Sequence, residues 1–142
     1  MTKESRLMAG VLIVTLPTVV FGGVSLLWLL LGDATYMANP LRQNLWRAGH
    51  AHAGVLLILS LVALRYVDES ALSASLRWFV RLAIPAAAIF LPLAFFLSVL
   101  SPTATEPNSM IYLAYVGAII LSLGTLVLGI GLVKSFWKPS EN

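Results

Sequence analysis

Four long apolar runs, separated by short polar segments, dominate the chain. A transmembrane helix needs about 20 mainly apolar residues, and the runs cover residues 7–31, 49–66, 76–100 and 109–133. The pattern predicts an all-α integral membrane four-helix bundle, built as a single transmembrane domain over residues 1–142. The first run is longer than a typical signal-peptide core and lacks a small-residue cleavage site at its end, so we interpret it as a helix.

Polar segments connect the predicted helices. Two loops, residues 32–48 and 101–108, lie on one side of the membrane, and a turn, residues 68–75, lies on the other. Within the first loop, Leu41, Leu45 and Trp46 allow a short amphipathic helix lying at the membrane interface. The alternative is a solvated loop anchored by Trp46, and both interpretations remain open.

Small residues inside the runs indicate where helices pack closely. Pro17 and the pair Gly22-Gly23 interrupt the first run, where they let the helix kink or a neighbour approach. In the last run glycine recurs every seven residues, at Gly117, Gly124 and Gly131. Such a stripe favours close helix packing in lipid, where no hydrophobic force drives association. Its partner can be another helix of this chain, a second copy in a homo-oligomer, or a larger membrane complex.

Composition agrees with membrane insertion. The chain is 59% apolar, with nine basic and six acidic residues, and its mean hydropathy is +0.91. A soluble domain of this size cannot bury so much apolar surface. Cysteine is absent, which excludes disulfides and thiolate ligands. The net charge of +3 comes from basic residues that flank the apolar runs and form no patch, so we do not expect nucleic-acid binding.

The basic residues also predict the orientation. Cytoplasmic segments of membrane proteins are enriched in Lys and Arg. Placing both termini inside the cell puts seven basic residues on the cytoplasmic side: Lys3, Arg6, Arg65, Arg77, Arg81, Lys134 and Lys138. Only Arg42 and Arg47 then lie outside. We therefore predict a multi-pass plasma-membrane protein with both termini cytoplasmic.

The predicted middle of the membrane contains hydroxyls but no ionisable side chain. Pumps and ion-coupled transporters usually need such a group at depth, so the pattern argues against them. The chain also lacks a phosphate-binding glycine loop, a metalloprotease motif and a nucleophile elbow. We therefore do not expect an enzyme.

The chemistry-bearing residues gather at the predicted outer end. His50 and His52, at the start of the second run, are the chain's two histidines. Residues two apart on a helix point about 200° apart, so a regular helix cannot direct both imidazoles to one metal ion. Gly54, one turn after His50, leaves room beside it for a flat ring. The alternative is two interfacial histidines that bond to loop carbonyls or lipid headgroups.

Residues 47–54, with the sequence Arg-Ala-Gly-His-Ala-His-Ala-Gly, resemble the His-x-His helix start of NnrS-type haem–copper membrane proteins. They also resemble the helix that bears a low-spin haem ligand in haem–copper oxidases, and small four-helix proteins with a His-Thr-His motif. The resemblance implies a b-type haem or copper ion bound by His50 or His52, with Arg47 and Gly54 beside it. The second ligand would be Met37, Met110 or a histidine of a second protomer.

The chain departs from those oxidases because it has no histidine after His52. A complete oxygen- or nitric-oxide-reducing site is therefore not expected within one chain. Three hypotheses remain: a haem- or copper-binding protein of electron transfer, metal handling or nitric oxide response; an accessory or scaffold subunit that packs against partner helices; and a quinone- or lipid-binding protein that uses Arg42, Arg47 and His50.

Overall fold

The computed structural model describes residues 1–137, which are helical apart from short connections. In order, the elements are α1 (Lys3–Gly32), α2 (Ala34–Met37), α3 (Pro40–Val67), α4 (Ala74–Ser98), the 3-10 helix η1 (Ser109–Tyr112) and α5 (Leu113–Phe136). Four stretches are long and apolar enough to cross a membrane: α1, α3, α4 and the continuous η1–α5 segment. The all-helical prediction with four long apolar helices is confirmed.

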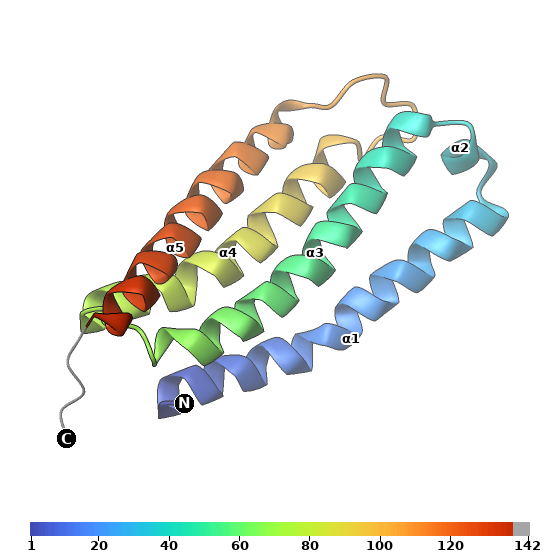
Figure 1. Ribbon diagram of the computed structural model, residues 1–142. Helices are drawn as coiled ribbons and strands as arrows, with labels where there is room; N and C mark the ends of the chain where they lie inside the picture. Colours follow the sequence, from blue (N-terminus) through green and yellow to red (C-terminus); the bar gives the residue numbers. More distant parts are fainter. Residues whose placement is uncertain (138–142) are drawn as a thin grey trace.

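The long helices lie side by side in the order α1, α3, α4, α5 (Figure 1). We call the end that carries the N-terminus and the α3–α4 turn the basal end, and the end that carries α2 and the 101–108 loop the distal end. Helix α4 packs along both α3 and α5, whereas α1 packs mainly along α3. The side of α1 is therefore the less extensively packed side of the bundle.

Helix α3 begins nine residues earlier than the predicted start at residue 49. Asn39 caps it by accepting a hydrogen bond from the backbone N–H of Arg42, and Pro40 occupies the first turn, where its missing N–H costs nothing. Most of the predicted first loop is thus helical. His50 lies ten residues inside a helix of 28 residues, about 15 Å from its start, and not at its mouth.

The other predicted boundaries differ less. Helix α1 begins four residues before the predicted position 7, and α4 runs two residues earlier at each end than predicted. The last predicted helix starts as the 3-10 turn η1. Within α1, Pro17 removes one backbone donor, and the ribbon bends near its middle (Figure 1).

The core is built by α3, α4 and α5. Its two clusters of buried apolar side chains are Ala63, Val67, Leu72, Val80, Ile84 and Leu128, and Leu56, Ala87 and Leu91. Helix α1 buries only Ser5 and Leu26 among its own residues. It is the least embedded of the long helices.

The glycine stripe of α5 packs within the chain. A Cβ at Gly117 would stand 2.8 Å from Leu91 Cγ, one at Gly124 would stand 3.0 Å from Ala83 Cβ, and one at Gly131 would stand 2.5 Å from Leu72 Cγ. All three glycines are buried. Within the described residues the stripe therefore packs against α4 and against Leu72 of the α3–α4 turn.

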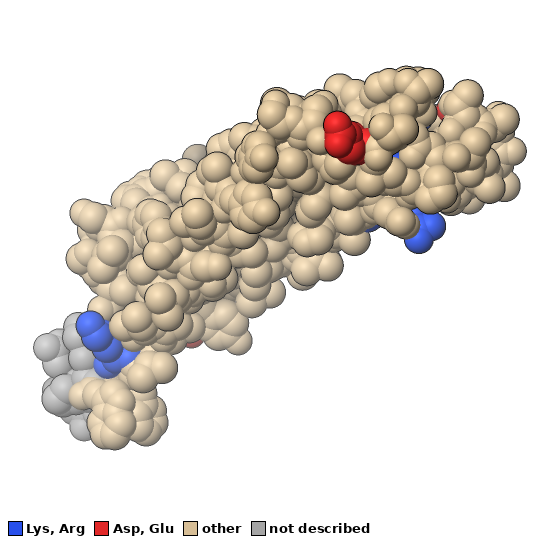
Figure 2. Space-filling model, turned by 90° about the horizontal axis from the view of Figure 1, so that it is seen from above, with Lys and Arg blue, Asp and Glu red and all other residues tan. Residues whose placement is uncertain are grey.

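Charged side chains lie toward the two ends of the molecule on the face that Figure 2 shows, and the middle of that face is uncharged. This distribution matches the four apolar helices and suggests a multi-pass membrane protein. Lys138, counted with the basal charges, lies outside the described residues.

Candidate functional site

His50 lies in the interface between α3 and α1, against the glycine pair of the first helix. A Cβ at Gly23 would stand 3.1 Å from Nε2 of His50 and 3.2 Å from Cε1, and a Cβ at Gly22 would stand 3.6 Å from Nδ1. The two glycines thus make the space that the imidazole fills. The ring is half-buried, and it is held by packing between two helices.

The imidazole of His50 takes part in none of the hydrogen bonds formed among residues 1–137. Its neighbours along α3 differ in this respect: Trp46 Nε1 donates to the carbonyl of Phe96, and Ser60 donates to the carbonyl of Leu56. A histidine always has at least one N–H donor, and its neutral form also has one nitrogen acceptor. His50 therefore keeps its hydrogen-bonding capacity for a group from outside the described chain.

An apolar groove of about 560 Å³ runs between α1, α3 and α4. It is lined by Leu7, Met8, Val11, Leu12, Thr15, Thr18, Val19, Ala53, Leu57, Pro85, Ala88 and Ile89. The hydroxyls of Thr15 and Thr18 donate to carbonyls of their own helix, so they add little polarity to the wall. No charged side chain lines the groove.

The distal end of the groove lies about one helical turn from His50. Its lining residues Ala53 on α3 and Val19 on α1 lie three residues from His50 and Gly22, which is about 4.5 Å along each helix. His50 itself does not line the groove, and it stands about one turn beyond the groove's distal end. Ligand sites in proteins commonly combine such an apolar cavity with a few polar groups that fix orientation.

His52 faces away from this site, as the helical spacing predicts. Its Nδ1 lies 2.7 Å from the carbonyl oxygen of Ala48, and its ring lies 5.1 Å from that of Phe95 on α4. Because a carbonyl can only accept, Nδ1 is the donor in this contact. The structure does not bring the two imidazoles together: His50 contacts α1 and His52 contacts α4.

The other residues predicted for a haem or metal site are dispersed. Met37 on α2 and Met110 on η1 are exposed at the distal end, and Arg47 is also exposed. A Cβ at Gly54 would meet Val19 at 3.7 Å, so α1 takes up the room expected there for a flat ring. Within residues 1–137, no group of three or more His, Cys, Asp or Glu residues is placed to hold a metal ion.

Arg42 has a different role from the one predicted. Its side chain is buried, its guanidinium lies 4.3 Å from the Trp46 ring, and Nε donates to the carbonyl of Val99 at 3.1 Å. These contacts satisfy the backbone at the carboxyl end of α4, where a cation is favoured by the helix dipole. Arg42 is therefore occupied within the protein and does not reach the groove.

Tyr36 packs beside Arg42 and Trp46. The Tyr36 ring is fully buried and lies 5.7 Å from that of Trp46, and its hydroxyl has no hydrogen-bond partner within the described residues. Burial raises the pKa of the Tyr36 hydroxyl, and the nearby charges of Arg47 and Arg42 oppose that shift. The sequence does not predict that Tyr36 is buried, because its burial depends on how α2 docks.

Comparison with protein-family models, curated proteins and solved structures finds no match to this chain. The function is therefore argued from the site alone.

Proposed function

We propose that this chain is a multi-pass plasma-membrane protein, with both termini cytoplasmic, that binds a quinone in the groove and bonds its head group through His50. The observation that carries this proposal is a half-buried imidazole, without a hydrogen-bond partner among residues 1–137, about one helical turn beyond the end of an apolar groove. Ionisable residues within membrane-spanning helices are rare and usually functional. The orientation is supported by basic residues at the basal end, with only Arg42 and Arg47 among the described ones at the distal end.

The chemistry of the groove favours a neutral head group with a long apolar tail. No Lys or Arg lines the groove to neutralise a phosphate, and Arg42 is already bonded to α4, which argues against a phospholipid. A quinone carbonyl is a neutral acceptor that matches an imidazole N–H, and an isoprenoid tail matches the apolar walls. The three helices thus supply a tail site, and His50 supplies the polar contact.

The test measures quinone binding to the full chain in lipid nanodiscs. A ubiquinone analogue with one isoprene unit is titrated and followed by quenching of tryptophan fluorescence. We expect saturable binding at one molecule per chain. Losing one hydrogen bond of about 1.5 kcal/mol would weaken binding by roughly tenfold in His50→Ala. His52→Ala is the matched control and should bind as the wild type does.

A second pair of variants tests the groove itself. Ala53→Phe puts a ring into the groove and should abolish binding, whereas Ala51→Phe, on the exposed side of the same helix, should not. Equal affinity in the wild type and His50→Ala would refute the role of His50. Binding that survives Ala53→Phe would place the ligand elsewhere.

A single haem or copper ion at His52 is the second candidate. It is favoured by the bond from Nδ1 to the Ala48 carbonyl, because metal-ligating histidines are commonly oriented by such a bond through their other nitrogen. This candidate predicts a Soret band or stoichiometric copper in the purified protein, lost in His52→Ala and retained in His50→Ala. The accessory-subunit hypothesis remains untested; the three glycines named for it pack within this chain.

A further inference from the structure

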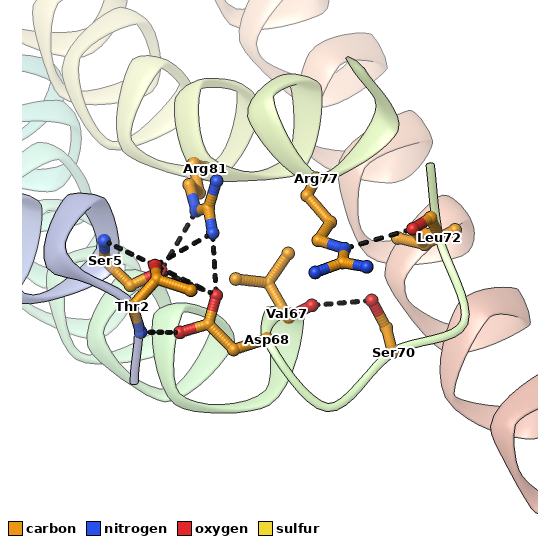
Figure 3. Close-up of polar contacts among 8 residues, drawn as sticks. All are labelled: Thr2, Ser5, Val67, Asp68, Ser70, Leu72, Arg77 and Arg81. Carbon is orange, nitrogen blue, oxygen red and sulfur yellow. Dashed lines mark hydrogen bonds and ion pairs between the residues drawn. The ribbon is translucent and has the colours of Figure 1, made fainter. Parts of the chain in front are cut away.

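A buried polar network ties the start of α1 to the α3–α4 turn at the basal end (Figure 3). The guanidinium of Arg81 lies 2.7 Å from Asp68 Oδ1, with side chains 6% and 9% exposed. The backbone N–H of Thr2 donates to Asp68 Oδ2 at 2.6 Å, and the Ser5 hydroxyl donates to Oδ1 at 3.0 Å. We call these four residues the basal latch.

Arg81 completes the latch from α4. Its Nε donates to Ser5 Oγ at 2.9 Å, and its Nη2 donates to Thr2 Oγ1 at 3.1 Å. In Figure 3 the side chains of Asp68 and Arg81 converge on the first turn of α1. The first helix is therefore held to both α3 and α4 at one point by a charged pair and its hydrogen bonds.

Beyond the latch, no residue in the basal half of α1 is fully buried. The next residue that α1 buries after Ser5 is Leu26, more than five turns later. Between them, residues such as Leu7, Val11 and Thr15 line the groove. This half of the helix lies over the groove, and the latch holds its free end.

Pro17 marks the other end of this segment. Proline has no N–H, so the carbonyl one turn earlier lacks its helical partner, and helices bend at such positions. The bend of α1 near its middle agrees with this (Figure 1). On the distal side of the bend, Gly22 and Gly23 hold α1 close to His50. The two halves of α1 are thus attached differently.

We propose that the basal half of α1 is a lateral gate to the groove, which hinges at Pro17, is closed by the basal latch, and opens between α1 and α4 toward the lipid. The identity of the ligand rests on the proposed function, but the movement of α1 does not. The core of α3, α4 and α5 has its own buried clusters, so α1 can swing while the core stays packed.

The test is a distance measurement between spin labels on the full chain in nanodiscs. The chain has no cysteine, so labels attach only where cysteines are introduced. Val14 on the basal half of α1 and Leu82 on α4 are both exposed and form the reporting pair. Leu27 and Leu93, also exposed, form the control pair on the distal side of the bend.

We expect Asp68→Asn to shift the Val14–Leu82 distances to longer and broader values and to leave the Leu27–Leu93 distances unchanged. The matched control is Glu69→Gln, because Glu69 is the next residue and pairs with Arg65 on the surface. Identical Val14–Leu82 distances in the wild type and Asp68→Asn would overturn the proposal. A simultaneous change in both pairs would also overturn it, since α1 would then detach as a whole.

Ser5→Ala guards against misfolding of the charge variant. It removes the hydroxyl that bridges Asp68 and Arg81 and leaves both charges in place, so a smaller shift in the Val14–Leu82 distances is expected.

Quinone binding kinetics, measured beside the spin-label distances, separate the gate proposal from the ligand proposal. An open gate with no quinone binding would refute the ligand alone, and quinone binding with unchanged α1 distances would refute the gate alone. Faster association and release in Asp68→Asn would support both.

Discussion

The imidazole of His50 fills the space left by Gly23, with Nε2 only 3.1 Å from where a Cβ on that glycine would stand. This contact fixes the approach of α1 to α3 at the distal end of the groove. It also makes the glycine and the histidine depend on each other, because neither position tolerates a larger side chain without movement of the other.

Gly23→Ala should therefore disturb the site without removing any of its groups. The new methyl group forces the ring to shift by a few tenths of an ångström, and overpacking of this kind costs about 1–3 kcal/mol. We expect a lower melting temperature in detergent and severalfold weaker quinone binding. Gly10→Ala, on the same helix with nothing within 4 Å, is the control and should change neither. An undisturbed Gly23→Ala would mean that α1 lies farther from His50.

Two neighbouring glycines of α5 should respond oppositely to alanine. A Cβ at Gly131 would clash with Leu72 Cγ at 2.5 Å, whereas a Cβ at Gly129 would meet nothing within 4 Å. We expect Gly131→Ala to destabilise the protein by about 1–3 kcal/mol. Gly129→Ala should be neutral or stabilising by up to about 1 kcal/mol, because alanine favours helix. Denaturation of both variants in the same detergent measures the difference, and equal effects would contradict the packing of α5 on Leu72 of the α3–α4 turn.

The four helices were predictable because apolar length alone reports a membrane-crossing segment. The start of α3 was not, since its first turns carry Arg42, Gln43 and Asn44 and raise no hydropathy signal. A local signal was present in Asn39-Pro40, a capping residue followed by a proline suited to a first helical turn. This signal predicts a helix that begins at Pro40, with both histidines in its interior.

The contacts that build the site were beyond one sequence. His50 and Gly23 lie on different helices, and nothing local states that the first and second apolar runs are neighbours. The same holds for Asp68 and Arg81, which looked like ordinary turn and interface charges until α1 was placed beside them. The helical spacing did predict that His50 and His52 point apart, because that property belongs to a single element.

Arg42 should matter more for stability than its exposed neighbour Arg47. Arg42 is buried, stacks on Trp46 and bonds to the Val99 carbonyl at the end of α4, and hydrogen bonds from charged groups contribute about 1.5–3 kcal/mol. We expect Arg42→Ala to lose about that much in a denaturation experiment, and Arg42→Lys to recover only part, because lysine lacks the planar guanidinium. Arg47→Ala should change stability little. If Arg42→Ala is as stable as the wild type, the contacts of Arg42 with Trp46 and Val99 do not stabilise the fold.

Asp68 makes the stability of the latch depend on pH. Burial raises the pKa of its carboxyl, but the hydrogen bonds from Thr2, Arg81 and Ser5 and the charge of Arg81 outweigh burial and bring the pKa below its usual 3.8. Because the pKa is lower in the folded than in the unfolded chain, the latch stabilises the protein fully above the unfolded value. That contribution is lost as the pH falls through the folded value.

We therefore expect the melting temperature of the wild type to fall below about pH 4, and to fall less in Asp68→Asn, which has no charge to lose there. The charged groups facing Asp68 are Arg81 on α4 and Glu4 on α1. Glu4→Gln tests the second carboxylate by itself. If this variant alone abolishes the acid sensitivity of the melting temperature, Asp68 is not the source of that sensitivity. The spin-label pair at Val14 and Leu82 should open over the same pH range, because protonation removes the charge that holds α1.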